Sequence, residues 1–539
     1  MKRLLIALMS VAMLASLGTV AWSEGSAEQA AAPAADEVVT VTLLQRQDPL
    51  GVGDFRTRGL YQVILDRFNL DIEARLMANE PFREQFKLII AAGDMPDMLA
   101  GVSRTTIDEL NQWGTDGLLY PVDTLMHVAP ELQRFYAQYP DAVDYNTAPD
   151  GHMYNIPGGY DSPIFYHGTA VRKDLLDSVG FDLDGVKDFD DYIDMYRALM
   201  EANDGKPVMS TRSGVGGLMA LPMKAVGLDG PSTISFDDDA DRFFFPYTSD
   251  AARFAVAWVR QLYEEGILHP DALIHGEDDW EPDMGELVYP ALFHDCVFCF
   301  TYNNEERYKR EHPESTSNFV AVKPPEYEGA LQPWRNRRVG TGLEIILNSE
   351  LPEWKAERIM GMLDWFRGEE GHAVSIMGIE GEDWVLLDGL PRQLYARPNN
   401  EYVFPEEWQS KVKSAEEFEA WNENWGYIKF AGDVAQKAWQ LGGQHLKNAD
   451  TNKFVNDYVP KYSQVYTASP SPRITFNEEE AEEIPSLRNA LNTAAYEWVA
   501  KAIVGQVDMA EWDDFQGQLQ ALGLERYEEI YNAAYARTK

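Results

Sequence analysis

The chain opens with alternating apolar and polar residues and continues with apolar residues at helical spacing. Residues 37–45 (EVVTVTLLQ) alternate and are rich in Val and Thr, which predicts a first strand. Leu60, Ile64 and Phe68 recur every fourth residue and predict a helix, and residues 72–76 predict a second strand. This alternation of strands and helices is typical of a doubly wound α/β fold with a mostly parallel sheet.

The same pattern continues into the next hundred residues. Phe82, Phe86 and Ile90 recur at helical spacing, so one face of that helix is expected to pack on the sheet. Residues 97–100 predict a short buried strand, and residues 106–113 predict a second helix. Ligands of such sheets bind beyond the carboxyl ends of the strands.

The bulk properties limit the class of protein. At 539 residues the chain is too long for one ordinary core, so two or more lobes are expected. Its formal net charge is −42, which argues against a nucleic-acid partner and against docking on anionic lipid.

The first residues predict a secretion signal. Lys2 and Arg3 precede an apolar run over residues 4–20, and residues 21–23 form a small-x-small cleavage site. We therefore predict a signal peptide over 1–23, cleaved after about Ser23, and a flexible leader over 24–37.

The chain has only two cysteines, and neither lies near the cleavage site. Cys296 and Cys299 fall in an apolar run that predicts a buried strand, where they are either free thiols or a strained disulfide. Because no cysteine follows the signal, the sequence lacks a lipid attachment site and predicts a periplasmic location.

Several stretches resemble a known family. A helix runs into A-x-G-D-x-P-D and, further on, into G-L-L-x-P-V-D within residues 86–123. This wording resembles the extracellular solute-binding proteins of ABC importers, in their large oligosaccharide-binding branch with alginate-binding-like relatives. Further matching pieces are D-G-x-x-Y-x-x-P at 150–157, R-K-D-x-L-x-x-x-G at 172–180, L-Y-x-E-G-x-x-x-P-D at 262–271, G-I-E-G at 378–381 and the closing pattern over 476–537.

The resemblance implies a periplasmic-binding-protein fold of type II, with two lobes that each contain a mostly parallel sheet. The expected first lobe comprises 38–164 and 322–375, and the second comprises 165–321 and 376–539 with C-terminal helices over 486–537. Hinges are expected near 163–166 and 318–325. The resemblance also implies that the turn around Asp94 and Asp97 lies at the rim of the ligand cleft.

Candidate ligand-binding residues are polar residues at expected strand ends and aromatic residues in expected loops, since sugar C–H faces pack on aromatic rings. Trp280 lies in an acidic stretch expected to be an irregular loop over 276–282, and Trp384 either lines the cleft or closes a structural turn. Arg46 either lies at the cleft mouth or pairs with a neighbouring acid. The full set is Arg46, Tyr160, Asp161, Trp280, Tyr302, Asn303, Trp334, Arg337, Trp384 and Trp425.

Trp334 lies among Arg335, Arg337 and Arg338. Guanidinium groups hold carboxylates or sugar hydroxyls through paired hydrogen bonds, so an acidic sugar is expected if these arginines face the cleft. The alternative is salt bridging between the lobes of a strongly acidic protein.

Several relatives carry a calcium loop that corresponds to residues 203–206. This sequence keeps only Asn203, Asp204 and Gly205 before Lys206, which places a cation where oxygen ligands are needed. We predict no metal at this point, no cofactor and no catalytic residue.

The resulting prediction is a monomeric, extracytoplasmic solute-binding component of an ABC transporter. It captures an oligosaccharide in an interlobe cleft and delivers it to the membrane permease. One alternative is a secreted glycosidase or lyase, although the sequence has no G-x-S-x-G or H-E-x-x-H signature. Another is a binder of peptides or other solutes on the same fold.

Overall fold

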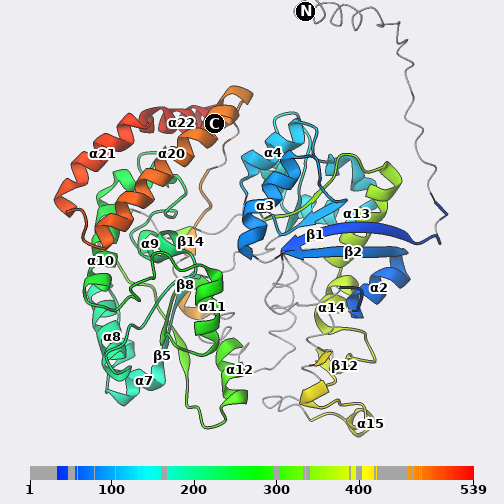
Figure 1. The fold of residues 1–539 in the computed structure, drawn as a ribbon, viewed down its shortest axis with the longest axis horizontal. Coiled ribbons are helices and arrows are strands. Elements are labelled where there is room, and N and C mark those ends of the chain that lie inside the picture. The colour runs from blue at the N-terminus through cyan, green and yellow to red at the C-terminus, as the bar shows by residue number, and fades with distance from the viewer. Residues whose placement is uncertain are drawn as a thin grey trace, which may run out of the picture.

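The computed structural model describes most of the chain after the leader. It covers residues 33–34, 36–46, 55–57, 59–77, 79–102, 105–158, 167–296, 303–331, 334–335, 340, 342–387, 390–395, 403–417, 420–421, 459–462, 466–472, 474 and 476–539. Figure 1 shows two bodies, with the first strands and helices on the right and the C-terminal helices on the left. We call them the first unit, built on a five-stranded sheet, and the second unit, built on a three-stranded sheet.

The sheet of the first unit is mixed. Its strand order is β2-β1-β3-β11-β4, in which β1 pairs in parallel with β2 and β3, and β11 runs antiparallel to β3 and β4. The strands are β1 (Val39–Arg46), β2 (Leu70–Met77), β3 (Met98–Ala100), β4 (Ile156–Gly158) and β11 (Gly342–Leu347). The first two predicted strands are therefore confirmed as parallel neighbours.

Helices cover both faces of this sheet, as the doubly wound pattern predicted. Successive side chains of a strand point to opposite faces, so Leu43 lies in one core and Leu44 in the other. On the Leu43 side lie α2 (Gly59–Phe68), α5 (Pro130–Gln138) and α13 (Glu353–Arg367), and on the Leu44 side lie α3 (Asn79–Ala91) and α4 (Ile107–Thr115).

Asp97 lies at the amino end of β3, opposite the edge where β1 and β3 end. Its carboxylate accepts hydrogen bonds from the backbone N–H and the hydroxyl of Thr42, at 2.7 and 2.8 Å, and pairs with Lys355 at 2.9 Å. Its side chain thus ties β1 and α13 to the sheet, and the position of this turn at the rim of a ligand cleft stays a prediction.

The sheet of the second unit is antiparallel. β5 (His167–Arg172) lies between β8 (Ala291–Cys296) and β9 (Phe319–Val322) and runs antiparallel to both, so the expected mostly parallel second sheet is corrected. A parallel bridge between Met209 and Leu268 extends the arrangement, because Ala291 N–H donates to the carbonyl of Val208.

The core of the second unit includes the C-terminal helices. They are α20 (Glu478–Ile503), α21 (Trp512–Ala521) and α22 (Leu524–Thr538), which confirms the three predicted helices. α20 begins earlier than predicted, because Asn477 caps it in a reciprocal box with Glu480. They share this core with α8 (Phe189–Ala202), α9 (Gly214–Ala225) and α10 (Asp250–Glu264).

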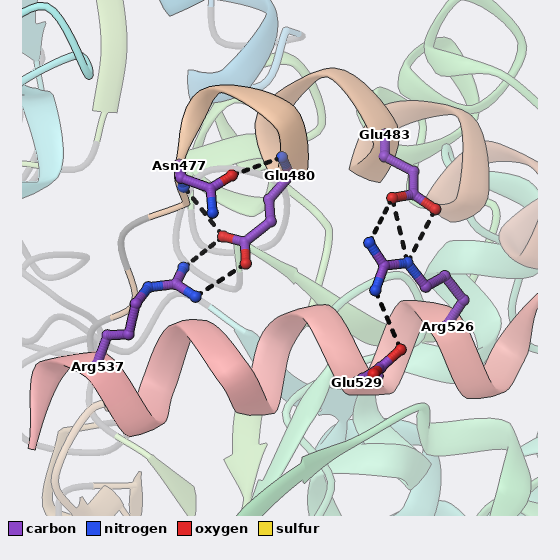
Figure 2. A network of polar contacts seen from close by, with 6 residues as sticks. All are labelled: Asn477, Glu480, Glu483, Arg526, Glu529 and Arg537. Carbon is purple, nitrogen blue, oxygen red and sulfur yellow. Dashed lines mark hydrogen bonds and ion pairs between the residues drawn. The ribbon is translucent and has the colours of Figure 1, made fainter.

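Ion pairs fasten α20 to the last helix, as Figure 2 shows. Arg537 pairs with Glu480, the residue that also closes the N-terminal cap of α20. Arg526 pairs with Glu483 at 2.8 Å and with Glu529 at 3.1 Å. These ion pairs hold the start of α20 against α22 at Arg526 and at Arg537.

The chain returns to the first unit after β9. Several contacts keep the returning segment on the second unit: Tyr192 donates to the carbonyl of Lys323 at 2.6 Å, and Leu331 N–H donates to Val226. Gly340 is on the first unit, where its carbonyl accepts from Asn146 at 2.8 Å. The change of unit therefore occurs after the hinge expected over 318–325, and residues 163–166 of the other expected hinge lie outside the described residues.

The segment after α14 (Glu369–Met377) also differs from the expected division of the chain. β12 (Trp384–Leu387) and β13 (Leu390–Gln393) form a hairpin with a small core of its own, and Trp421 packs against the core of the first unit. Figure 1 shows this hairpin below α14 on the right-hand side. The expected second lobe includes residues 376–421, but these contacts place them beside the first unit.

The remaining described α-helices and strands are short. They are α6 (Pro140–Asn146), α7 (Lys173–Ser178), α11 (Glu277–Gly285), α12 (Asn303–Glu311), α15 (Glu406–Gln409), α19 (Val459–Tyr462), β6 (Ser235–Asp237), β7 (Arg242–Phe244), β10 (Trp334–Arg335) and β14 (Tyr466–Ala468). Among the described residues, none of the helices has the length and apolar character needed to cross a membrane.

Replacing Asp97 by alanine is expected to lower the free energy of unfolding of the first unit by about 2–3 kcal/mol, because Lys355 and Thr42 lose their shared partner. Urea unfolding followed by circular dichroism measures the change. The matched control is Asp94→Ala, since Asp94 is exposed in the same turn. Equal losses in the two variants would contradict the structural role of Asp97.

Candidate functional site

The carboxyl edge of the first sheet is the place where a ligand of an α/β protein is expected. β1 ends there at Arg46 and β3 ends at Ala100, and the side chain of Gln45 is buried at the same edge. Arg46 thus lies at the predicted strand end, and whether its side chain faces a ligand stays a prediction.

The N-terminus of α4 follows this edge and is held by a capping box. The Thr106 hydroxyl accepts from Glu109 N–H at 3.2 Å, and the Glu109 carboxylate accepts from Thr106 N–H at 3.0 Å. Glu109 also pairs with Lys87 at 2.7 Å and accepts from Thr105. Burial alone would raise the pKa of Glu109, but Lys87 and the hydrogen bonds outweigh it and hold that pKa below its ordinary value.

Arg488 of α20 joins the two units at this helix end. Its guanidinium lies 3.0 Å from the Asp108 carboxylate and 3.3 Å from the Thr106 hydroxyl, and both charged side chains are only about one-sixth exposed, at 16% and 15%. Burial works against the charge of Arg488, but Asp108 keeps its pKa above the ordinary value. The ion pair therefore links the C-terminal helices to α4, which packs on the first sheet.

Polar side chains cluster in the second unit on the two segments that follow the bridge between Met209 and Leu268. Arg212 pairs with Glu277, which is almost fully buried, and lies 3.6 Å from Glu281. The hydroxyl of Ser210 lies 2.8 Å from Nδ1 of His275. Figure 1 shows α11, which follows this region, on the side of the second unit that faces the first.

Trp280 is a core residue. The stretch expected to be an irregular loop forms α11, whose start is fixed by a hydrogen bond from Gly276 N–H to the Asp279 carboxylate at 3.1 Å. The Trp280 side chain is 1% exposed and lies in the core of the second unit. Because neither face of the ring is open, the assignment of Trp280 as a sugar platform is corrected.

Trp334 is also largely enclosed. Its strand β10 pairs with β14, and its ring meets Tyr462 edge-on with centroids 6.1 Å apart. With 7% exposure it contributes to the core of the second unit instead of presenting a face to ligand.

Trp384 is half-buried at the start of β12. Its indole N–H donates to the carbonyl of Gly378 at 3.0 Å, which closes the turn that leads into the hairpin. Gly378 has a positive φ of 83°, and a Cβ there would lie 2.3 Å from the Asp383 carboxylate, so the turn requires glycine. This geometry favours the structural alternative for Trp384.

Arg335 is engaged within the second unit. Its guanidinium lies 3.2 Å from Asp229 and 3.0 Å from Asp238, and donates to the carbonyls of Phe236 and Ser469. Burial raises the pKa of the Asp229 carboxyl, although Arg335 favours its charged form. The first arginine of the cluster thus ties β10 to the sheet of β6 and β7.

Residues 56–272 match the sequence model of the bacterial extracellular solute-binding protein family. This stretch of the chain is similar to that family. The prediction of a non-enzymatic binding component is confirmed. The protein is exported. The chain is 23% identical over 485 residues to the fructooligosaccharide ABC transporter substrate-binding protein FusA of Streptococcus pneumoniae serotype 4, covering 84% of this chain and 82% of the relative.

Solved structures show the same mixed α/β periplasmic-binding-protein fold. The alginate-binding protein AlgQ2, solved without calcium ion, matches 94% of this chain and 100% of its own chain with a TM-score of 0.70 and 19% identity. The N-glycan transport solute-binding protein NgtS from Streptococcus pneumoniae matches 92% and 99% with a TM-score of 0.59 and 13% identity.

The other candidate residues are not brought together by the described structure. Asn303 begins α12, and nothing is described of its side chain. Tyr160, Asp161, Tyr302, Arg337 and Trp425 lie outside the described residues, as do Cys299 and the signal peptide.

The turn that corresponds to the calcium loop of relatives is bonded to itself. Gly205 N–H donates to Met200, Lys206 N–H donates to Asn203, and the Asn203 amide donates to Pro207 at 3.3 Å. These bonds use the backbone of a tight helix end, and the absence of a metal here stays a prediction.

Replacing Trp280 by alanine is expected to lower the free energy of unfolding by about 3–5 kcal/mol, because the large buried ring leaves a cavity. Urea unfolding measures the loss, and Trp384→Ala is the control because its ring is only half-buried. A Trp280→Ala variant with unchanged stability and lost ligand binding would restore the platform assignment.

Reversing the charge of Arg488 with Arg488→Asp is expected to loosen the contact between the units and to raise the radius of gyration measured by small-angle scattering. The double variant Arg488→Asp with Asp108→Arg should recover the compact form, with a coupling energy of about 1–2 kcal/mol. The control Arg526→Ala removes ion pairs that lie within the second unit. Equal expansion in the control would contradict a link between the units.

Proposed function

We propose that this protein is the extracytoplasmic substrate-binding component of an ABC importer and that it captures an oligosaccharide between two lobes, which correspond to the first and second units. The observation that carries the proposal is the pairing of two separately packed sheets, joined by chain crossings, with a match to an ABC-transporter sugar-binding relative over most of both chains.

The arrangement supports capture by hinge closure. Each unit has a core of its own, so the units can rotate as bodies while only the crossings and the contact at Arg488 change. A ligand that contacts both units binds the closed arrangement better and shifts the population towards it. A permease that recognises the closed form then receives the oligosaccharide from the protein. The binding protein acts as a monomer.

The class of ligand rests on the relatives. FusA is named for fructo-oligosaccharides, AlgQ2 for alginate and NgtS for N-glycans, so an oligosaccharide is the shared chemistry. Arg335 is already neutralised by Asp229 and Asp238, so recognition of an acidic sugar depends on Arg337 and Arg338. Ligand contacts are proposed at Arg46, Tyr160, Asp161, Tyr302, Asn303, Arg337 and Trp425.

Export to the periplasm completes the proposal. The signal peptide is removed after about Ser23, and the mature protein carries no lipid because no cysteine stands at the cleavage site. Mass spectrometry of the protein recovered from a periplasmic extract tests both points.

Ligand class is tested by a thermal-shift screen of the mature protein, followed by calorimetry and by mass analysis of each sugar after incubation. The panel contains fructo-oligosaccharides, alginate oligosaccharides, N-glycan fragments and, as a control, oligopeptides. We expect one sugar class to stabilise the protein by about 2.7 kcal/mol at a hundredfold excess over Kd and to be recovered intact.

The outcomes separate the alternatives. Stabilisation by peptides alone would contradict sugar binding while keeping the binding-protein fold. A shortened or unsaturated sugar after incubation would contradict a transport role. Arg337→Ala is the matched variant for charge: it should weaken an alginate ligand more than a neutral one.

A further inference from the structure

We infer that the second unit contains a transition-metal site, of the kind that takes Zn²⁺, formed by His269, Asp271 and His275. One ligand atom from each of the three side chains lies within 4.8 Å of the other two. Among the residues that the structure describes, this is the group of histidine, cysteine or acidic side chains placed closely enough to hold an ion. The site is separate from the calcium loop of relatives at residues 203–206.

The local backbone brings these three side chains together. Ala272 N–H donates to His269 at 2.9 Å, and His275 N–H donates to the carbonyl of Asp271 at 3.0 Å. The second bond joins residues four apart, as in one turn of a helix, so Asp271 and His275 present their side chains on the same side. The two imidazole rings lie nearly parallel with centroids 4.8 Å apart.

His275 has a hydrogen-bond neighbour that suits one tautomer of its ring. Its Nδ1 lies 2.8 Å from the hydroxyl of Ser210, which can accept the Nδ1–H proton and leave Nε2 with a lone pair for a metal. Histidine ligands of metals are typically held in this way, with the second ring nitrogen bonded to an outer group. Ser210 therefore acts as a positioning residue.

His269 offers its lone pair through Nδ1. That atom accepts a hydrogen bond of 3.2 Å from Asp271 N–H, so in the neutral ring it is the unprotonated nitrogen. An ion would replace this long hydrogen bond at little cost. In a tetrahedral zinc site the ligand atoms lie about 3.4 Å apart, so the three side chains must draw closer together when an ion binds.

The two segments that form the site are locked against each other. His269 N–H donates to the carbonyl of Met209, directly before Ser210. Gly214 has a positive φ of 52°, and a Cβ there would lie 2.6 Å from the carbonyl oxygen of Leu273, so only glycine permits this approach. Ser210 and the histidines are thus held at fixed places before any ion binds.

The ligand set selects the metal. Imidazole nitrogens favour Zn²⁺, Ni²⁺, Co²⁺ and Cu²⁺, whereas Ca²⁺ and Mg²⁺ prefer oxygen ligands. Three protein ligands leave the fourth tetrahedral position open to water or to a group of a solute. Because the segment that carries the three ligands is hydrogen-bonded to the segment before α9, an ion there would stabilise the second unit.

The test is a titration of metal-free, tag-free mature protein with Zn²⁺ against a chromophoric chelator, with Ca²⁺ as a competitor and Co²⁺ as a spectroscopic probe. We expect one equivalent of Zn²⁺, a raised Tm, visible absorption typical of tetrahedral Co²⁺ and no competition by Ca²⁺. His269→Ala and His275→Ala should each weaken binding at least a hundredfold, and Ser210→Ala about tenfold.

Three variants keep the test decisive. Asp271→Asn changes an exposed side chain, so it should fold normally by circular dichroism and still weaken binding about tenfold. His127→Ala removes a surface histidine that pairs with Glu357 and should leave binding unchanged. Failure of the wild type to bind Zn²⁺ overturns the inference. So does binding that survives in both histidine variants but is lost when Cys296 and Cys299 are replaced by serine.

Discussion

The strand β11 is the constraint on which the two-unit architecture depends. Ile345 and Ile346 are fully buried on opposite faces of the five-stranded sheet, so one short strand supplies side chains to both cores of the first unit. In the sequence, this strand follows β5 and β9, which belong to the second unit. Neither core of the first unit is complete before then, and contacts of such long sequence separation are typical of slow folding.

The sequence predicted the first unit better than the second, for a physical reason. The helices around Leu60 and Phe86 are long enough to show a clear period, and the strand between them could only pair in parallel. The second sheet has strands of four to six residues, and no pattern within so short a run indicates its direction. Its antiparallel arrangement follows from the path of the chain through the helices between these strands, which local periodicity does not contain.

The candidate site was predicted less well, because burial of an aromatic ring is decided by tertiary packing. Trp280 lies on an acidic nine-residue helix whose sequence has no apolar period. Such a sequence predicts a loop and an exposed ring. The pairing of Arg488 with Asp108 had no signal in the sequence beyond an acid in the first turn of a helix. By contrast, the alternative role of Trp384 in a turn was visible beforehand, because a Gly-rich motif precedes it.

The tight placement of Gly340 limits how the two units can move. A Cβ at this residue would lie 2.5 Å from Ala142, and Arg335 is equally fixed on the other unit by two carboxylates. Arg335 and Gly340 are thus fixed on different units. Because Arg488 and Asp108 also lie on different units, the distance between them would act as a gauge of how far the protein has closed.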